Sequence, residues 1–432
     1  MTLDQWLGYI EQQHPASIEL GLERVRQVYS RMFEGESAHP GCPVISVAGT
    51  NGKGSSVTLL STILAADGYR VGSYTSPHLV HYNERVSING KPLDNATLCA
   101  GFDAVENARG DTPLTYFEYG TLCAFWCFRQ ANLDAWVLEV GLGGRLDAVN
   151  VIDADVALIT QIGLDHQDWL GHDRETIGRE KAGIMRPGKV VICSDPAPPA
   201  SIRECADTVG ASLLQLGDLF SFTSSESGWQ WRQADSVPVE LPLPAMTGKA
   251  QLNNAAGVIA ALRLGGLPLA VSQEAVETGL REARIAGRFQ VYPAGTVSDA
   301  EIIVDVAHNE DSARVLGDVL RSRPTAGRRL AVWSMYRDKD RIAAARTVGD
   351  VFDAWYIAAM AGARAASADE LLASAVAAGI DVTCCQQLAT VELAFDAALR
   401  NATAGDQVVV FGSFELAGGI LAAIENRACS HG

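Results

Sequence analysis

The residues best suited to chemistry form a glycine-rich turn between an apolar run at 44–48 and a helical pattern at 54–68, and they are Gly49, Thr50, Asn51, Gly52, Lys53, Gly54 and Ser55. Glycines let the backbone approach an anion, and the N–H groups of such a turn and of the following helix attract negative charge. Lys53 adds a charge suited to the β- and γ-phosphates. The strict P-loop pattern is not met, because Val47 and Gly54 replace its first Gly and its Ser or Thr. Ser55 takes the hydroxyl position, and we interpret the turn as a nucleoside triphosphate site.

Polar side chains also follow two later strand-like runs. The run at 133–138 leads into Glu139, and the run at 156–161 is followed by Asp165 and His166. Ligands bind at the carboxyl ends of parallel strands, so Glu139 is the leading candidate for the acid that holds Mg²⁺. The alternative for Glu139 is an acid that caps a helix. His166 could equally cap a helix or fill a polar gap, because hard cations prefer oxygen to imidazole.

Further candidate residues lie in a second glycine-rich turn, in a loop, in a helix and at the end of a later strand. A second glycine-rich turn at 141–147 could bring Arg145 and Asp147 to the same place. A loop at 74–79 carries hydroxyl groups that could face a nucleotide, and Lys181 would ordinarily be a solvated helical lysine. The segment 304–309 repeats the pattern of polar residues at a strand end, with a helix cap as its alternative.

Composition excludes several classes of partner. The chain has 432 residues and a net charge of −17, from 34 Lys and Arg against 51 Asp and Glu, which disfavours nucleic acid and anionic membranes. Its nine cysteines show neither a paired framework nor zinc spacing, which favours the reducing cytoplasm. We expect no membrane segment and no export signal, because no apolar run is long enough and the first residues lack a basic region. Monomer is the default expectation.

Alternating strand-like and helical patterns predict an α/β protein of two domains. The first, 1–286, is expected to hold a P-loop-type, mostly parallel sheet with helices on both faces, interrupted by a β insertion at 195–245. The second, 287–432, is expected to be a Rossmann-like α/β domain. Its predicted strands lie at 301–306, 329–334, 353–359 and 406–412.

Eight ordered motifs together resemble the folylpolyglutamate synthase family, a branch of the Mur-type ATP-dependent amide ligases. They are GTNGKGS at 49–55, SPHL at 76–79, EVGLGGRLDA at 139–148, LDH at 164–166, EKAGI at 180–184, NNA at 253–255, GRF at 287–289 and DVAHN at 305–309. The resemblance covers most of the chain. The loop Gly412-Ser413-Phe414-Glu415 departs from the family pattern, and its role stays open.

The resemblance implies an ATP and metal site. Residues 49–55, Asn254, Arg288 and Asp305 would contact ATP, with Lys53 acting on the phosphates. His308 would help position phosphate or glutamate. Two Mg²⁺ ions and a monovalent cation are implied, with Lys181 carbamylated so that it offers oxygen to the metal. The implied metal ligands are Ser76, Glu139, His166 and Lys181.

The segment 17–22 resembles a loop that covers a dihydropteroate site in bifunctional bacterial members of the family. The implied pteroate contacts are Ile18, Glu19, Leu20, Thr115, Phe117, Arg145, Asp147 and Ala148. This favours an enzyme that joins L-glutamate to dihydropteroate and to tetrahydrofolate or its polyglutamates. The alternatives are a monofunctional folylpolyglutamate synthase, a P-loop kinase or ATPase, and a nucleotide sensor without turnover.

Overall fold

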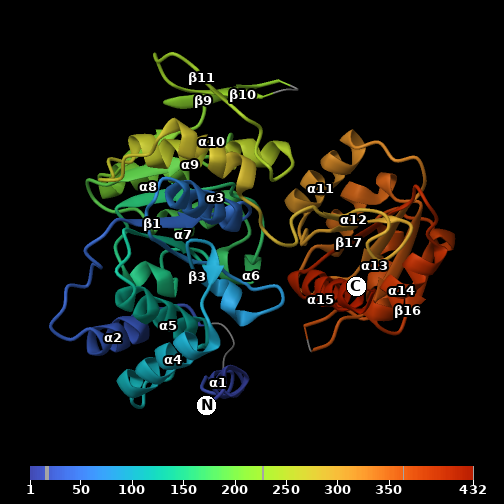
Figure 1. Cartoon of the computed structure of the whole chain (residues 1–432), viewed down its shortest axis with the longest axis horizontal. Coiled ribbons are helices and arrows are strands. Elements are labelled where there is room, and N and C mark those ends of the chain that lie inside the picture. Colours follow the sequence, from blue (N-terminus) through green and yellow to red (C-terminus); the bar gives the residue numbers. More distant parts are fainter. Residues whose placement is uncertain (15–18, 226–227, 363, 432) are drawn as a thin grey trace. The chain divides into compact units, whose positions relative to one another are not determined.

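The computed structural model describes residues 1–14, 19–225, 228–362 and 364–431. The chain divides into two compact units (Figure 1). The first comprises Met1–His78, Tyr82–Ala245 and Ala250–Arg284, and the second comprises Leu79–His81, Met246–Lys249 and Ile285–Gly432. The chain therefore passes from one unit to the other more than once, and three residues directly after the SPH segment belong to the second unit.

The first unit is built on an eight-stranded sheet in the order β4-β3-β2-β5-β1-β6-β7-β8. Its parallel strands are β1 (Val44–Ala48), β2 (Val71–Tyr74), β5 (Ala135–Glu139), β6 (Val156–Ile159), β7 (Val190–Cys193) and β8 (Ser212–Gln215). At one edge, β3 (Val86–Ile88) and β4 (Lys91–Pro92) pair antiparallel. The predicted mostly parallel sheet is confirmed.

Helices cover both faces of this sheet. On β6, Ala157 and Ile159 belong to a core cluster with helices α7 and α8, whereas Leu158 lies beside Gly257 of α9. Neighbouring strand residues point to opposite faces, so these contacts place helices on each side. The helices of the unit are α1 (Leu3–Ile10), α2 (Glu23–Met32), α3 (Lys53–Ala66), α4 (Asn95–Arg109), α5 (Tyr116–Gln130), α6 (Gln167–Leu170), α7 (Arg174–Ala182), α8 (Ser201–Val209), α9 (Lys249–Leu264) and α10 (Gln273–Glu282).

A separate antiparallel sheet of the first unit contains β9 (Phe220–Ser224), β10 (Trp229–Gln233) and β11 (Val239–Leu241). Trp231 fastens it to α9 by donating its indole N–H to the Ala256 carbonyl over 3.2 Å. This antiparallel part is narrower than the predicted 195–245 insertion. The earlier residues of that segment form α8, which buries Ile202 and Ala206, and β8, which extends the main sheet.

The second unit holds a six-stranded sheet in the order β12-β13-β17-β14-β15-β16. The strands are β12 (Gln290–Tyr292), β13 (Glu301–Val304), β14 (Arg329–Trp333), β15 (Ala354–Ala358), β16 (Cys385–Leu388) and β17 (Gln407–Phe411). All neighbours are parallel except β12, which pairs antiparallel with β13. Neither β12 nor β16 was predicted from the sequence, and the three residues of β12 are too few to show alternation.

The helices of the second unit again cover two faces of its sheet. Val408 and Val410 of β17 join one core cluster, and Val409 and Phe411 join another. These helices are α11 (Glu310–Ser322), α12 (Arg341–Val348), α13 (Ala368–Ala377), α14 (Val391–Asn401) and α15 (Phe414–His431). In the described parts of the chain, no helix combines the length and apolar character needed to cross a membrane.

Candidate active site

The phosphate loop runs from the end of β1 at Ala48 to the start of α3 at Lys53. Gly52 has a φ of +94°, and a Cβ added there would lie 2.4 Å from Oδ1 of Asn254. A Cβ on Gly49 would lie 1.8 Å from Oγ1 of Thr160. Glycine is therefore required at both positions, and the close approach at Gly52 brings together two of the predicted ATP-binding residues.

Lys53 lies over the phosphate loop. Its Nζ donates to the carbonyl oxygens of Gly49 and Thr50, each over 3.1 Å. Ser55 is buried and accepts from Nε2 of Gln251 over 3.3 Å, and Nδ2 of Asn254 donates to Oε1 of Gln251 over 3.0 Å. Gln251 was missed by the sequence analysis, although its position three residues before Asn254 on a helix places both on one face.

The phosphate loop is fastened to the segment that follows β6. The N–H of Thr50 donates to the Gln161 carbonyl over 2.7 Å, and Nδ2 of Asn51 donates to Oε1 of Gln161 over 3.1 Å. Oγ1 of Thr50 accepts from the N–H of Gly163 over 2.9 Å and donates to its carbonyl over 3.0 Å. The two strand ends therefore present one continuous polar edge.

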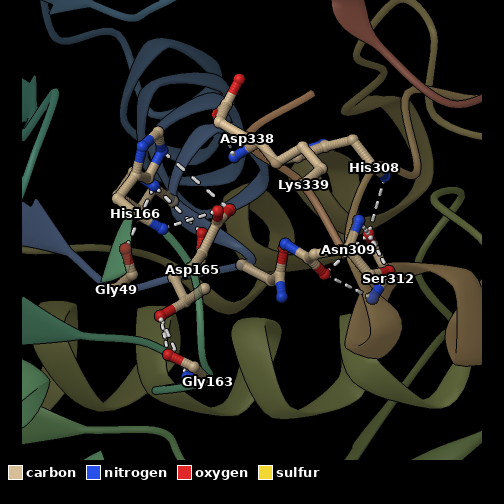
Figure 2. Close-up of polar contacts among 12 residues, drawn as sticks. Gly49, Gly163, Asp165, His166, His308, Asn309, Ser312, Asp338 and Lys339 are labelled. Carbon is tan, nitrogen blue, oxygen red and sulfur yellow. Dashed lines mark hydrogen bonds and ion pairs between the residues drawn. The ribbon is translucent and has the colours of Figure 1, made fainter. Parts of the chain in front are cut away.

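His166 stands at that edge, at the start of the short helix α6. It has a φ of +51°, and its N–H donates to Oδ1 of Asp165 over 2.8 Å. Its side chain is about one third exposed, whereas that of Asp165 is buried. Figure 2 shows Gly49, Gly163, Asp165 and His166 gathered at this place. The imidazole is thus beside the phosphate loop rather than in the core.

Glu139 is the last residue of β5, which lies next to β1 in the sheet. The register pairs Glu139 with Val47, so its carboxylate comes to the same edge as the phosphate loop. Glu139 is buried, and the N–H of Ser76 donates to its Oε2 over 3.3 Å. Two of the predicted metal ligands, Ser76 and Glu139, are therefore in contact.

Lys181 is buried near the end of α7, not solvated. Burial, and then the positive charge of Lys53, lower the pKa of its amine to about 7, against the pull of Asp165 and Asp147. The second glycine turn packs on this part of the helix: a Cβ on Gly144 would lie 3.0 Å from the Lys181 carbonyl oxygen. A lysine with such a pKa holds a large uncharged fraction near neutrality, which is the form that reacts with CO₂.

The predicted donor set fits a hard cation only if Lys181 is modified. Among the described residues, no three His, Cys, Asp or Glu side chains come close enough together to hold a metal ion by themselves. Only Glu139 and His166 of the predicted set are of those types, and the others are a hydroxyl and an amine. Mg²⁺ prefers oxygen, so the hydroxyl of Ser76 suits it and a free amine does not, whereas a carbamate would.

Four of the predicted pteroate residues, Phe117, Arg145, Asp147 and Ala148, lie in or beside the second glycine turn. Asp147 is fully buried and accepts from the N–H groups of Leu142 over 2.8 Å and Val149 over 3.0 Å. Burial raises its pKa to about 7 in spite of these hydrogen bonds and of the Lys53 charge. Ala148 begins the adjoining 3-10 helix η2 (Ala148–Val151), and the Phe117 ring packs so closely on Gly141 that a Cβ there would lie 2.4 Å from it.

The other pteroate candidates differ in their burial and in the residues they contact. Thr115 is buried as the N-cap of α5, where its Oγ1 accepts from the N–H of Glu118. Arg145 is half exposed and pairs with Glu180 over 2.8 Å. Glu19 pairs with Arg24, which also pairs with the buried Glu118 over 2.9 Å. Leu20 is partly exposed, and Ile18 lies outside the described residues.

The second unit brings its own predicted residues together. Asp305 follows β13, accepts from the N–H groups of Phe289 over 2.8 Å and Ala307 over 2.7 Å, and has its pKa raised by burial against the Arg288 charge. Arg288 lies 5.6 Å above the ring of Phe414, and the His308 ring lies 5.5 Å from the same ring. Nδ1 of His308 contacts the Val306 carbonyl over 2.8 Å.

Comparison with known proteins defines first a class of enzyme. Residues 47–262 match the Mur ligase middle domain, and residues 287–414 match the domain described as Mur ligase, glutamate ligase domain. The phosphate loop lies within the first matched range, and Arg288 and Asp305 lie within the second.

Individual relatives narrow that class. The chain is 44% identical to dihydrofolate synthase/folylpolyglutamate synthase of Escherichia coli, over 98% of this chain and 96% of the relative. The structure of E. coli FolC in complex with DHPP and ADP matches with a TM-score of 0.91 and 43% identity, over 99% and 98% of the two chains. A bifunctional folylpolyglutamate synthase/dihydrofolate synthase with Mn, AMPPNP and L-glutamate bound matches at 0.88 and 42%, over 98% of each chain. The chain therefore belongs to the dihydrofolate synthase/folylpolyglutamate synthase branch of the Mur ligase family.

Proposed function

We propose that this chain is an ATP-dependent ligase that joins L-glutamate to dihydropteroate and to tetrahydrofolate or its polyglutamates. The observation that carries the proposal is the common edge formed by the phosphate loop, Glu139 and His166, in a chain that matches bifunctional enzymes over nearly its full length. Those relatives bind nucleotide, Mn and L-glutamate according to their descriptions. ATP and a divalent cation are accordingly the expected co-substrate and cofactor.

The first step activates the carboxylate of the pterin substrate. An oxygen of that carboxylate attacks the γ-phosphorus of ATP, the bond from the γ-phosphorus to the β,γ-bridging oxygen breaks, and ADP leaves. Residues 49–55 surround the phosphates with N–H groups, and Lys53 exchanges its loop carbonyls for phosphate oxygens. Catalysis of such a transfer depends on positioning and on charge neutralisation.

The second step forms the amide. The uncharged α-amine of L-glutamate attacks the acyl carbon, and inorganic phosphate leaves. Ser76, Glu139, His166 and carbamylated Lys181 would hold two Mg²⁺ ions, and a monovalent cation would bind in addition. Bound divalent metal supplies positive charge next to the phosphoryl and acyl oxygens. Arg288, Asp305 and Asn254 contact ATP in this proposal, and His308 positions phosphate or glutamate.

Asp147 would bind the pterin ring of dihydropteroate. Its buried carboxylate suits the adjacent N–H donors of a pterin ring, because an ionised acceptor makes the strongest hydrogen bonds with paired donors. Phe117 offers an aromatic ring against Gly141 of the same turn. The remaining proposed pteroate contacts are Ile18, Glu19, Leu20, Thr115, Arg145 and Ala148.

The test is ADP formation with dihydropteroate or tetrahydrofolate, each with and without L-glutamate. The proposal expects ADP with both acceptors, and only when L-glutamate is present. ADP formation with tetrahydrofolate alone would reduce the chain to a monofunctional folylpolyglutamate synthase. ADP formation that ignores L-glutamate would instead indicate a kinase or ATPase, and nucleotide binding without turnover would indicate a sensor.

A further inference from the structure

Arg174 and Asp195 join three segments of the first unit that no sequence motif connects. Arg174 is the first residue of α7, and Asp195 follows β7. Nη2 of Arg174 donates to Oδ2 of Asp195 over 3.0 Å. Only 3% of the Asp195 side chain is exposed, whereas 42% of the Arg174 side chain is. The Asp195 carboxylate is therefore buried, and the Arg174 guanidinium lies between it and the solvent.

Together the two side chains hold both backbone polar groups of Ile162. The N–H of Ile162 donates to Oδ2 of Asp195 over 2.9 Å, and Nε of Arg174 donates to the Ile162 carbonyl over 2.7 Å. They hold Ala197 in the same way, through its N–H to Asp195 over 2.9 Å and its carbonyl to Arg174 over 2.8 Å. The pair thus fixes the ends of β6 and β7 against the start of α7.

The segment after β6 also forms hydrogen bonds with the phosphate loop. Thr50 holds the N–H and the carbonyl of Gly163, which directly follows Ile162. His166 lies three residues further along the same segment. Ile162 and Gly163 are consequently fixed by side chains from two directions before the chain reaches the imidazole.

We infer that Arg174 and Asp195 are positioning residues for the metal-ligating pair His166 and Lys181. The inference rests on the proposed metal role of those two residues. His166 lies on the segment after β6, and Lys181 lies on α7. The guanidinium of Arg174 belongs to α7 and contacts the segment after β6. It therefore fixes the spacing between His166 and Lys181. Groups that orient ligands in this way typically contribute about 10–100-fold to metal affinity or activity.

Two variants test the inference without large changes in shape. Asp195→Asn keeps the size of the side chain but removes its charge, and Arg174→Lys keeps the charge but loses the planar fork that reaches two carbonyls and a carboxylate. The matched control is Arg179→Lys on the same helix, whose exposed pair with Glu204 spans 3.2 Å. Each full-length protein is titrated with Mn²⁺ in the presence of AMPPNP, and free Mn²⁺ is read by electron paramagnetic resonance. ADP binding in EDTA and the thermal midpoint are measured alongside.

The inference expects the half-saturating Mn²⁺ concentration to rise about 10-fold or more in Asp195→Asn and in Arg174→Lys. ADP binding in EDTA should stay unchanged, and Arg179→Lys should match the unsubstituted protein. Equal Mn²⁺ affinity in all proteins would overturn the inference, even if the two variants melt earlier, because that pattern means a structural role only. If Asp195→Asn does not fold, Arg174→Lys decides the question alone. Failure of the unsubstituted protein to bind Mn²⁺ with AMPPNP would overturn the proposed metal site and, with it, this inference.

Discussion

Asp147 offers a pH-dependent test of the buried site. Its carboxyl has a pKa of about 7 in the folded protein against an ordinary value of 3.8, because burial disfavours the charged form. Between those two values the folded state holds more protons at this group than the unfolded state does, so the free energy of unfolding must fall as pH rises. A shift of this size, about 3 pH units, corresponds to about 4 kcal/mol.

The perturbation is Asp147→Asn, which cannot ionise. Asparagine offers one oxygen to the two N–H groups of Leu142 and Val149, and leaving one unsatisfied costs about 1–3 kcal/mol at every pH. The variant nevertheless lacks the pH-dependent loss. Relative to the unsubstituted protein, its free energy of unfolding should therefore increase by about 4 kcal/mol between pH 4 and pH 8.

Urea unfolding at half-unit steps of pH measures that difference. Asp94→Asn is the control, since Asp94 also caps a helix but is exposed, and hydrogen bonds to the Thr97 N–H and side chain lower its pKa. Its difference from the unsubstituted protein should be constant over this range. A constant difference for Asp147→Asn as well would refute the assignment of a buried, proton-retaining carboxyl. Affinity for dihydropteroate should also weaken below pH 7, where the carboxylate becomes protonated.

Three other substitutions address the phosphate loop and the metal site. Lys53→Ala should lower the ligation rate by about 10²–10³-fold, as expected for the loss of one preorganised electrostatic donor, and near-normal ligation would exclude its role. Lys181→Ala should lose activity that bicarbonate cannot restore and short carboxylic acids partly restore, whereas a mass spectrum of active enzyme with unmodified lysine would remove the carbamate. Gly52→Ala should raise the KM for ATP because its Cβ would meet Asn254 at 2.4 Å. Gly188→Ala, with a φ of +70° and open space, is its control and should keep that KM, and an equal KM in both variants would contradict the close approach.

The strands that carry the site could be predicted because their signals are local. The apolar run at 44–48 forms β1, and the first four residues of the run at 156–161 form β6. Polar residues directly after parallel strands must come to one edge of the sheet. Glu139 was found by this rule alone. Its partner Ser76 lies in a loop whose hydroxyls were expected to face a nucleotide, but its role as a metal ligand came only from the family resemblance, because a loop serine carries no periodic pattern.

Other parts of the site depend on contacts between distant segments. Gln251, Arg174 and Asp195 hold backbone or side-chain groups far away in sequence, and a single charged or polar residue gives no sign of that. Lys181 sits in a helix of mostly polar residues, yet it is buried, and Gly144 from a distant turn lies against the end of that helix. Such features arise only when the tertiary structure has formed.

The most direct test of the central claim follows an oxygen atom. Dihydropteroate labelled with ¹⁸O in its carboxylate is incubated with the protein, ATP, Mg²⁺ and L-glutamate, and the inorganic phosphate released is examined by mass spectrometry. Activation of the carboxylate by ATP predicts one ¹⁸O atom in each phosphate formed together with an amide. Unlabelled phosphate, released at the same rate as the amide product, would contradict the account.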